Sequence, residues 1–256
     1  MTEKTKIPVS GCIVTYNSAG EIEDCIESLL SHTEGVDFHL YISDNGSSDG
    51  TPEAVKRRFP QVTVLENGEN LGFGRGHNQA LPLLSSRYHV CINPDIRLEE
   101  DAITRLVAYL EEHPEVGMVM PDIRNEDGSR QELPKYDPTW WYLIGGRLFP
   151  GVRDKYCRKG ELDGGPVKIE FCTGCFHVIR TDLLKELGGF DDRYFLYLED
   201  ADLAREVRAR ADVMFHPGIR VVHLWHRESS RSLHGLKLHL SSARKYFRKW
   251  RYAGRK

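Results

Sequence analysis

The chain has 256 residues, of which 40% are hydrophobic, and its formal net charge is −3. This length is enough to bury the core of one large domain, and the balanced charge gives no indication of nucleic acid as a partner. No run approaches the roughly 18 consecutive apolar residues of a membrane span, and no apolar signal core follows the first residues, so we expect a cytoplasmic protein.

Short apolar runs alternate with segments of helical periodicity through the first 120 residues. The expected strands are 9–15, 38–42, 62–65, 88–92 and 116–120, and the expected helices are 21–30, 52–59, 77–84 and 101–112. Thr51 is the expected N-cap of the second helix, with Pro52 at its first position. This alternation is typical of βαβ units, so the predicted fold class is α/β with a mainly parallel central sheet flanked by helices.

The alternation stops between Arg124 and Val167. Prolines, glycines and the aromatic run Trp140-Trp141-Tyr142 indicate an insertion or mobile loop there, not a second domain. Regular structure is expected to return with a strand pair in 168–180, helices at 182–187 and 201–210, and strands at 213–216 and 220–224.

Six cysteines are placed irregularly, which fits a reducing compartment. Cys12 and Cys91 lie in expected strands, where a reduced thiol behaves as a small apolar side chain. Cys172 and Cys175 have CxxC spacing, but a single pair lacks the second pair or histidine set of a structural zinc site. We therefore expect neither zinc nor redox chemistry at that pair.

Two acidic segments directly follow expected strands: Asn93-Pro94-Asp95 after 88–92, and Asp44-Asn45-Gly46 after 38–42. The carboxyl ends of parallel strands form the edge at which open α/β sheets bind ligands. Val14-Thr15-Tyr16-Asn17 ends the first strand at this edge, where the Tyr16 ring can support a nucleotide base. The sequence therefore predicts a cleft for a metal-bound ligand that contains phosphate.

Asp44 can accept a hydrogen bond from a pyrimidine imide or a ribose hydroxyl, and its position favours this role over the alternative of a simple turn. Asp49 is better explained as a helix-capping residue. Asn70 to Asn78 is a glycine-rich loop before a helix, where backbone N–H groups can meet a phosphate or a sugar. The loop does not directly follow a strand, so it does not match a dinucleotide fingerprint.

Asp95 has the hard oxygen chemistry that suits Mg²⁺ or Mn²⁺. His223, which ends an expected strand, is the candidate further ligand, with His226 as a less favoured one; the alternative is an ordinary packed histidine. Glu199 and Asp200 begin an expected helix, whose dipole helps to keep a carboxylate ionised. Asp200 can then act as a general base toward an acceptor hydroxyl, although an acidic residue at this position can also be only a cap.

Together these motifs resemble those of family 2 glycosyltransferases, in order and spacing, over about residues 8–231. The matching segments are Val14-Thr15-Tyr16-Asn17, Asp44-Asn45-Gly46-Ser47-Ser48-Asp49, Asn70-Leu71-Gly72-Phe73-Gly74, Asn93-Pro94-Asp95, Gly188-Gly189-Phe190-Asp191 and Glu199-Asp200-Ala201-Asp202-Leu203. The Gly-Phe-Gly loop and the Asn-Pro-Asp motif look most like bacterial rhamnosyltransferases that extend lipid-linked surface polysaccharides such as O-antigen and cell-wall polymers.

The resemblance implies a GT-A fold over residues 1–231 and an inverting transfer in which Asp200 is the base. It implies an acceptor side formed by Glu199, Gly174, Cys175 and the insertion 124–167. The implied donor-binding residues are Thr15, Tyr16, Asn17, Asp44, Asn45, Asn70, Gly72, Phe73, Asn93 and Asp95. It also implies Mg²⁺ or Mn²⁺ at Asp95, for which His223 is the candidate further ligand given above, although Asn93 replaces the usual first Asp and leaves the metal dependence open.

With dTDP-β-L-rhamnose as donor, inversion would give an α-L-rhamnoside on a lipid-linked saccharide. A UDP- or GDP-sugar donor and a non-catalytic sugar-binding relative remain alternatives, the second because of Asn93. A nucleotidyltransferase would share the acidic sheet edge, but residues 9–20 hold no basic phosphate-binding motif.

Residues 232–256 are predicted to form a basic amphipathic helix. Its apolar residues, spaced by three or four, are Leu236, Leu240, Ala243, Phe247 and Trp250. Such a helix can lie on an anionic membrane surface, here the cytoplasmic face of the inner membrane, where a lipid-linked acceptor would be found. Packing on the catalytic domain, or on a second subunit in a homodimer, is an equal alternative.

Overall fold

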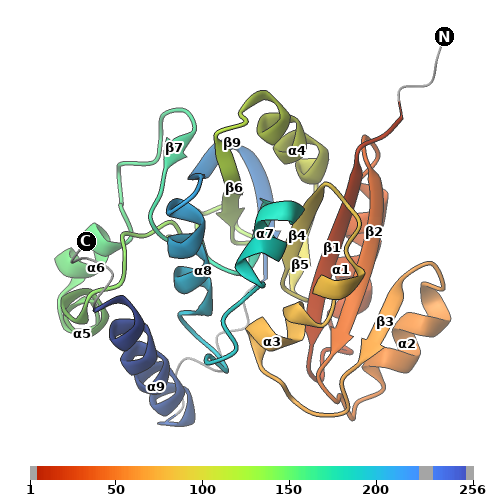
Figure 1. Ribbon diagram of the computed structural model, residues 1–256, viewed down its shortest axis with the longest axis horizontal. Helices are drawn as coiled ribbons and strands as arrows, with labels where there is room; N and C mark the ends of the chain where they lie inside the picture. Colours follow the sequence, from red (N-terminus) through yellow and green to blue (C-terminus); the bar gives the residue numbers. More distant parts are fainter. Residues whose placement is uncertain (1–4, 225–232, 252–256) are drawn as a thin grey trace.

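A computed structural model describes residues 5–224 and 233–251 of the chain (Figure 1). Its centre is one sheet in the order β3-β2-β1-β4-β8-β6-β9-β5, with β7 paired to β9. The strands are β1 Pro8–Thr15, β2 Asp37–Asp44, β3 Thr63–Glu66, β4 Tyr88–Ile92, β5 Ile96–Arg97, β6 Val116–Arg124, β7 Val167–Lys168, β8 Phe176–Arg180 and β9 Asp212–His223.

The helices are α1 Ile22–Ser31, α2 Thr51–Arg58, α3 Phe73–Asn78, α4 Ala102–Glu112, α5 Trp140–Leu148, α6 Pro150–Tyr156, α7 Thr181–Leu187, α8 Glu199–Arg208 and α9 Leu233–Trp250, with a 3₁₀ turn η1 at Leu81–Leu83. Figure 1 shows α5, α6 and α9 gathered at one end of the molecule, beside α8. Within the described ranges, no helix combines the length and the apolar character needed to cross a bilayer.

The predicted α/β arrangement is present, and the sheet is mixed. Strands β3, β2, β1 and β4 run parallel, as do β6 and β9. Strand β8 joins these two groups and is antiparallel to both β4 and β6. The mainly parallel character expected from the βαβ alternation therefore holds within each group, and the carboxyl ends of β1, β2 and β4 lie at one edge.

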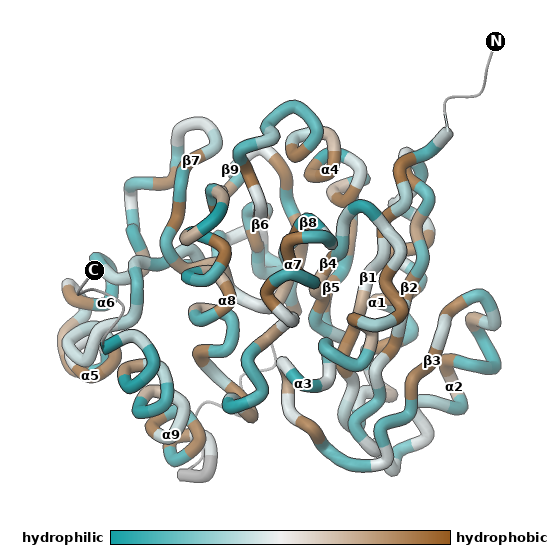
Figure 2. Tube along the Cα trace, in the orientation of Figure 1, coloured by the Kyte–Doolittle hydropathy of each residue, from teal (hydrophilic) through white to brown (hydrophobic). Residues whose placement is uncertain are grey.

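The core forms where the sequence is most apolar. All five residues of β4 are buried, as expected for a central strand covered on both faces. Helix α1 buries Ile22, Ile26 and Leu29 on one stripe, and α4 begins where the Asp101 carboxylate accepts a hydrogen bond from Thr104 N. Figure 2 shows hydrophobic stretches concentrated along the strands and on the inner sides of the helices.

Four local expectations were wrong. The helix expected at 77–84 begins earlier, at Phe73, and Pro82 leaves only a 3₁₀ turn after it. Helix α2 is preceded by Gly50, with φ of 84°, so Thr51 is its first residue and not its cap. The strand pair in 168–180 does not form, because β7 pairs with β9 and β8 lies between β4 and β6.

The fourth concerns 213–224, where one strand, β9, replaces the two expected. It follows β6 through a register shift next to Pro121 and Asp122, so the Pro217-Gly218 step bends the strand without ending it. The predicted insertion also has more order than a loop, since α5 and α6 lie within it. Asp49 acts at the start of α2 as expected, where its carboxylate accepts hydrogen bonds from Thr51 N and Ala19 N.

Helix α9 packs against the rest of the domain. Ala243 and Tyr246 are fully buried in a cluster with Tyr194, Leu198 and Ala201. Polar contacts reinforce this packing, since Lys249 Nζ lies 2.6 Å from Asp202 Oδ2 and Trp250 Nε1 donates to Asp202 Oδ1 at 2.8 Å. Of the two possibilities for the amphipathic helix, packing on the catalytic domain is therefore observed.

Candidate active site

The ends of β1 and β2 are joined through Thr15 and Asp44, which face each other in the parallel register. Thr15 Oγ1 donates to Asp44 Oδ1 at 2.9 Å, and Gly46 N and Ser47 N donate to Asp44 Oδ2 at 3.0 and 2.8 Å. The buried Asp44 carboxylate thus holds the turn after β2. The sequence alone favoured a nucleotide contact for Asp44 over such a turn. Its contact with a nucleotide stays a prediction. The Tyr16 ring beside this turn is 53% exposed.

Three asparagines fasten the loops at this edge. Asn17, with φ of 55°, accepts a hydrogen bond from Ser48 N at 2.8 Å. Asn45 Nδ2 donates to Gly72 O at 3.0 Å, and Asn70 Oδ1 accepts from Gly72 N at 3.0 Å. The predicted donor residues Asn45, Asn70 and Gly72 therefore form one hydrogen-bonded unit that fixes the glycine-rich loop against β2.

Gly72 is required by this close packing. Its φ is 82°, and a Cβ atom there would lie 2.1 Å from the carbonyl oxygen of Phe195. That carbonyl accepts a hydrogen bond from Phe73 N at 2.9 Å. The glycine-rich loop is thus attached directly to the segment that precedes α8. This loop and the candidate base Asp200 therefore lie in one connected region.

Gly174 brings Phe73 and Asp200 together. Its N–H donates to Asp200 Oδ2 at 3.1 Å, and a Cβ atom on Gly174 would lie 2.8 Å from Cε1 of Phe73. The next residue, Cys175, accepts a hydrogen bond from Asn93 N through its carbonyl oxygen at 2.8 Å. Residues predicted separately for the donor and the acceptor are therefore in contact around the loop before β8.

Asp95 and His223 meet at the end of β4 and β9. His223 Nε2 lies 3.1 Å from Asp95 Oδ1, and the side chains are only 6% and 13% exposed. Asp95 Oδ1 is buried and has no hydrogen-bond partner among the described residues. The two atoms are thus close without the alignment of a hydrogen bond. The other candidate, His226, lies outside the described residues.

Gln131 fixes which nitrogen of His223 carries the proton. The amide of Gln131 donates through Nε2 to His223 O and Asn125 Oδ1, both at 2.8 Å, so its oxygen faces His223 Nδ1 at 2.9 Å. Nδ1 therefore donates to Gln131 Oε1, and Nε2 is the ring nitrogen on the side of Asp95.

These residues fit a divalent cation. Adjacent ligands of a six-coordinate ion with bonds near 2.1 Å are about 3 Å apart, which matches the separation of Asp95 Oδ1 and His223 Nε2. Asn93 adds only a neutral amide, with Nδ2 3.5 Å from His223 Nε2. The donor set therefore carries one negative charge fewer than a pair of aspartates would.

Glu199 and Asp200 begin α8 after a strained turn. Tyr197 and Leu198 both have positive φ, 72° and 65°, a conformation that side chains with a Cβ rarely adopt and that often marks functional sites. Glu199 is 4% exposed, and its Oε2 has no partner among the described residues. Asp200 is half-buried, and its carboxylate also accepts from Ala201 N at 2.9 Å.

The two carboxyls differ in the groups that act on their pKa values. Burial, together with the charge of Asp200, raises the pKa of Glu199 well above its ordinary value. Burial also raises the pKa of Asp200, but the Lys135 ammonium and the Gly174 N–H oppose that shift. These surroundings therefore favour the proton on Glu199 and the negative charge on Asp200, which is the charge that a general base needs.

Gln131 and Lys135 were not anticipated, and both lie in the predicted insertion. Gln131 orients His223 across 92 positions of sequence, and Lys135 acts on Asp200. Lys135 Nζ lies 5.0 Å from the ring centre of Phe171, which fits a cation–π contact. No periodicity or motif around either residue signals these roles.

Residues 10–188 match the family model described as Glycosyl transferase family 2. N-acetylglucosaminyl-diphospho-decaprenol L-rhamnosyltransferase from Mycobacterium tuberculosis is 28% identical over 229 residues, which cover 82% of this chain and 74% of the relative. Rhamnosyltransferase WbbL from Escherichia coli is 24% identical over 237 residues, which cover 88% of each chain.

Among solved structures, the mannosyltransferase PcManGT from Pyrobaculum calidifontis, in complex with GDP-Man and Mn²⁺, superposes with a TM-score of 0.68 at 21% identity. The match covers 98% of this chain and 66% of the mannosyltransferase. GalNAc-T7 with UDP, GalNAc and Mn²⁺ gives a TM-score of 0.66 over 88% of this chain. These likenesses confirm the predicted GT-A type of fold. Since the family model matches well over half of its length, the chain belongs to glycosyl transferase family 2.

Proposed function

We propose that the protein transfers L-rhamnose from dTDP-β-L-rhamnose to a hydroxyl of a lipid-linked saccharide, with inversion at the anomeric carbon. The observation that carries the proposal is the contact of Asp200 with Gly174, which places the candidate base beside Phe73 at the start of α3. The rhamnosyl donor is supported by two relatives named as rhamnosyltransferases, one of which is named for a decaprenol-linked acceptor.

In this mechanism Asp200 removes the proton of the acceptor hydroxyl while that oxygen attacks the anomeric carbon. The new C–O bond forms on the face opposite the bond to the dTDP oxygen, which breaks, so the β-linked donor yields an α-L-rhamnoside and dTDP. The Gly174 N–H orients the Asp200 carboxylate. The raised pKa makes Asp200 a stronger base than an exposed aspartate, and neutral Glu199 adds no second charge beside it.

Asp95 and His223 would hold Mg²⁺ or Mn²⁺, with Gln131 fixing the His223 ring. A bound cation supplies positive charge to the diphosphate that leaves with the nucleotide. Use of a divalent cation is supported by two neighbouring structures that contain Mn²⁺. Asn93 in place of an acid reduces the negative charge of the site, so we expect the metal to bind more weakly than at a pair of aspartates.

We also propose that the protein is cytoplasmic and binds the inner membrane peripherally, through the end formed by α5, α6 and α9. The apolar residues Ala243 and Tyr246 of α9 are buried, so the membrane contact falls to α5 and the residue after it, where Trp141, Leu148 and Phe149 are 61%, 68% and 53% exposed. A depression of about 790 Å³ at the same end is lined by Trp140 of α5 and by Arg244 and Arg248 of α9, among other residues.

This arrangement is chemically suited to an anionic bilayer. Exposed tryptophans insert at the headgroup level, and arginines around them pair with lipid phosphates. The same end adjoins the candidate base, since Leu198 and Ala201 pack in one cluster with Ala243 and Tyr246. A lipid-linked acceptor held in the membrane would thereby present its sugar close to Asp200.

The proposal is tested by thermal shift with a panel of nucleotide sugars, each with and without Mg²⁺ or Mn²⁺, because a ligand that binds only the folded state raises the melting temperature. Selective stabilisation by dTDP-rhamnose is expected. A preference for a UDP- or GDP-sugar would keep the transferase and discard rhamnose, and no response to any nucleotide would favour a non-catalytic relative.

A further inference from the structure

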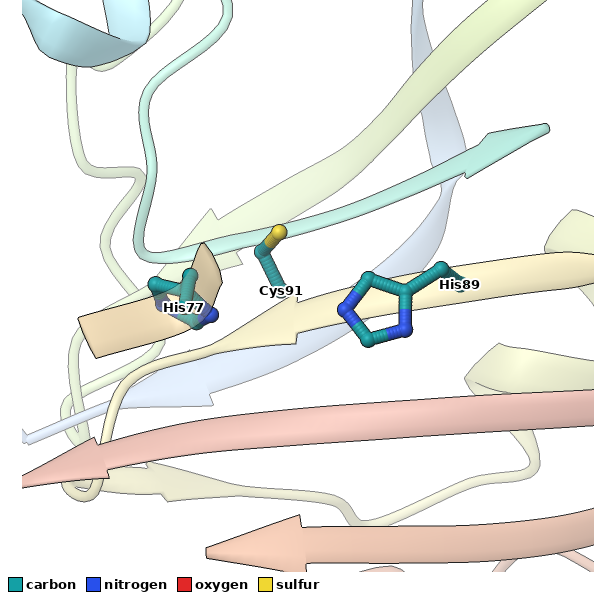
Figure 3. Close-up of side chains that lie close together, drawn as sticks. All are labelled: His77, His89 and Cys91. Atoms are coloured by element: carbon teal, nitrogen blue, oxygen red, sulfur yellow. The ribbon is translucent and has the colours of Figure 1, made fainter. Parts of the chain in front are cut away.

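Three buried side chains with metal-binding atoms meet in the core beneath α3, and a fourth lies opposite one of them on the neighbouring strand. The ligand atoms of His77, His89 and Cys91 all lie within 4.8 Å of one another, and these residues are 4%, 1% and 0% exposed. Figure 3 shows His77 reaching the cluster from α3, and His89 and Cys91 from β4. The fourth residue is His177 of β8, which is 1% exposed.

The fold explains why these residues meet. His89 and Cys91 are two residues apart on β4, so both project from the same face of the sheet. His177 is directly opposite Cys91 in the antiparallel register, and side chains in such pairs share a face. His77 approaches this face from α3, the short helix formed by the second part of the glycine-rich segment.

Several polar atoms of this cluster are unsatisfied. Both ring nitrogens of His77 and Nε2 of His177 are buried without a hydrogen-bond partner among the described residues. Buried imidazoles of this kind normally find a partner, because leaving them unpaired costs free energy. His89 is already oriented, since its Nδ1 lies 2.8 Å from Ser10 Oγ, which leaves Nε2 as its ligand atom.

The protonation states suit metal binding. Burial lowers the pKa of His89 to about 3 and that of His177 to about 4, so both rings are neutral and keep a lone pair. Burial raises the pKa of the Cys91 thiol well above its usual value, so a metal ion must displace one proton when it binds there. Buried water is the ordinary alternative for unpaired polar atoms in a core, but it would not explain why a thiol lies among the imidazoles.

We propose that His77, His89 and Cys91 bind one Zn²⁺ ion, with the Cys91 proton released on binding and with His177 moving closer to become the fourth ligand. Three imidazoles and one thiolate form a donor set of the nitrogen and sulfur type that zinc accepts in tetrahedral sites. The ion would link α3 to β4 and to β8. Strand β4 leads to Asp95, and β8 follows Gly174. It would thus be a structural clamp behind the candidate active site, separate from the cation at Asp95.

The first test is the zinc content of protein purified without chelator and without a histidine tag, measured by mass spectrometry on the Asp95→Asn variant so that the open site does not contribute. About one zinc per chain is expected. His89→Gln and Cys91→Ser should lose it, whereas Cys157→Ser and His39→Gln, which change a buried thiol and an exposed imidazole elsewhere, should keep it.

Cobalt substitution gives an independent measurement, which is made first on the wild-type protein and then on the variants. Protein refolded with Co²⁺ should show thiolate-to-cobalt charge-transfer absorption, absent when Cys91 is replaced and present with Cys157→Ser. Folded wild-type protein with no zinc above background, and no such absorption after refolding with Co²⁺, would overturn the proposal. Neither measurement uses a nucleotide sugar, so the result is independent of the proposed transferase reaction.

Discussion

The backbone N–H of Gly174 donates a hydrogen bond to Oδ2 of Asp200 at 3.1 Å, across 26 positions of sequence. The bond joins the loop before β8 to the first turn of α8, and the absence of a side chain on Gly174 lets Phe73 pack against the same point. The loop before β8 therefore holds the candidate base Asp200 and also contacts Phe73, a predicted donor-binding residue.

Replacing Asp200 with Asn should abolish transfer and leave donor binding nearly intact. The amide keeps the shape and can still accept the Gly174 N–H, but it cannot take a proton, so we expect turnover to fall by about 10²–10⁴-fold. Turnover is measured by release of dTDP, and binding by thermal shift. Asp192→Asn, at an exposed position in the segment between α7 and α8, is the control. Near-normal turnover in Asp200→Asn would show that the base is another group.

Glu199 should make the stability of the protein fall as the pH rises. Its folded-state pKa is raised, so above the ordinary glutamate value the folded protein keeps a proton that the unfolded chain has lost. In that window the unfolding free energy falls by about 1.4 kcal/mol per pH unit, until the folded-state pKa is passed. Glu199→Gln should remove this slope, measured by urea unfolding between pH 5 and pH 8, roughly the range above the glutamate reference value.

The same substitution separates the two carboxyls in catalysis. Asp200 loses its proton while Glu199 still holds one, so the acidic limb of the pH–rate profile should belong to Asp200 and stay unchanged in Glu199→Gln. Exposed Glu53→Gln is the control for both measurements. A stability profile with the same slope in Glu199→Gln and the parent would contradict the assignment of the buried proton.

Gly72→Ala should displace the glycine-rich loop, which is predicted to bind the donor. Its φ of 82° disfavours a side chain, and the new methyl would lie 2.1 Å from Phe195 O, so the loop must move away from the segment before α8. We expect a loss of about 1–3 kcal/mol in stability and weaker donor binding. Gly68→Ala is a matched control, since Gly68 has φ of 72° but open space around it; equal effects in both variants would show that only backbone strain matters.

Gln131→Ala should weaken metal binding without touching a ligand. The variant loses the hydrogen bond between Gln131 Oε1 and His223 Nδ1, and outer-shell changes of this kind typically cost about 10–100-fold in metal affinity. The measurement is a Mn²⁺ titration of the donor-induced thermal shift. Gln79→Ala, at an exposed position outside this network, should behave like the parent, and an unchanged Mn²⁺ midpoint in Gln131→Ala would remove His223 from the metal site.

The sequence predicted the acidic sheet edge well because its signals are local. Continuous apolar runs identify β1, β2 and β4, and the residues that follow each run must lie at one edge if the strands are parallel. His223 was a candidate ligand because it ends an expected strand, but no local signal pairs it with Asp95, since the two residues follow strands that are far apart along the chain.

The parts that were missed depend on pairing between distant segments. Pro217-Gly218 looks like a turn between two strands, yet β6 continues alongside and keeps β9 as one strand. Gln131 and Lys135 have no local pattern, because their partners His223 and Asp200 are fixed only by the complete fold. Cys91 was expected to be apolar filler, and only the register of β4 against β8 places His177 beside it.

Membrane binding should depend on α5 more than on α9. Trp141 and Leu148 are largely exposed, whereas Ala243 and Tyr246 of α9 are buried in the cluster that also holds Leu198. The double variant Trp141→Ser and Leu148→Ser should therefore lose binding to vesicles that contain phosphatidylglycerol, and its stability should be nearly unchanged because neither side chain supports the core.

The measurement is cosedimentation with vesicles of phosphatidylcholine alone and of phosphatidylcholine mixed with phosphatidylglycerol. Binding of the parent should require the anionic lipid and weaken with salt, because Arg244 and Arg248 beside the apolar residues act electrostatically. Leu83→Ser is the matched control, since Leu83 is 48% exposed in η1, outside this end of the molecule. If Leu83→Ser reduced binding as much as the α5 double variant, the contact would not be the surface formed by α5, α6 and α9, and a lipid-linked acceptor would have to reach Asp200 from another side.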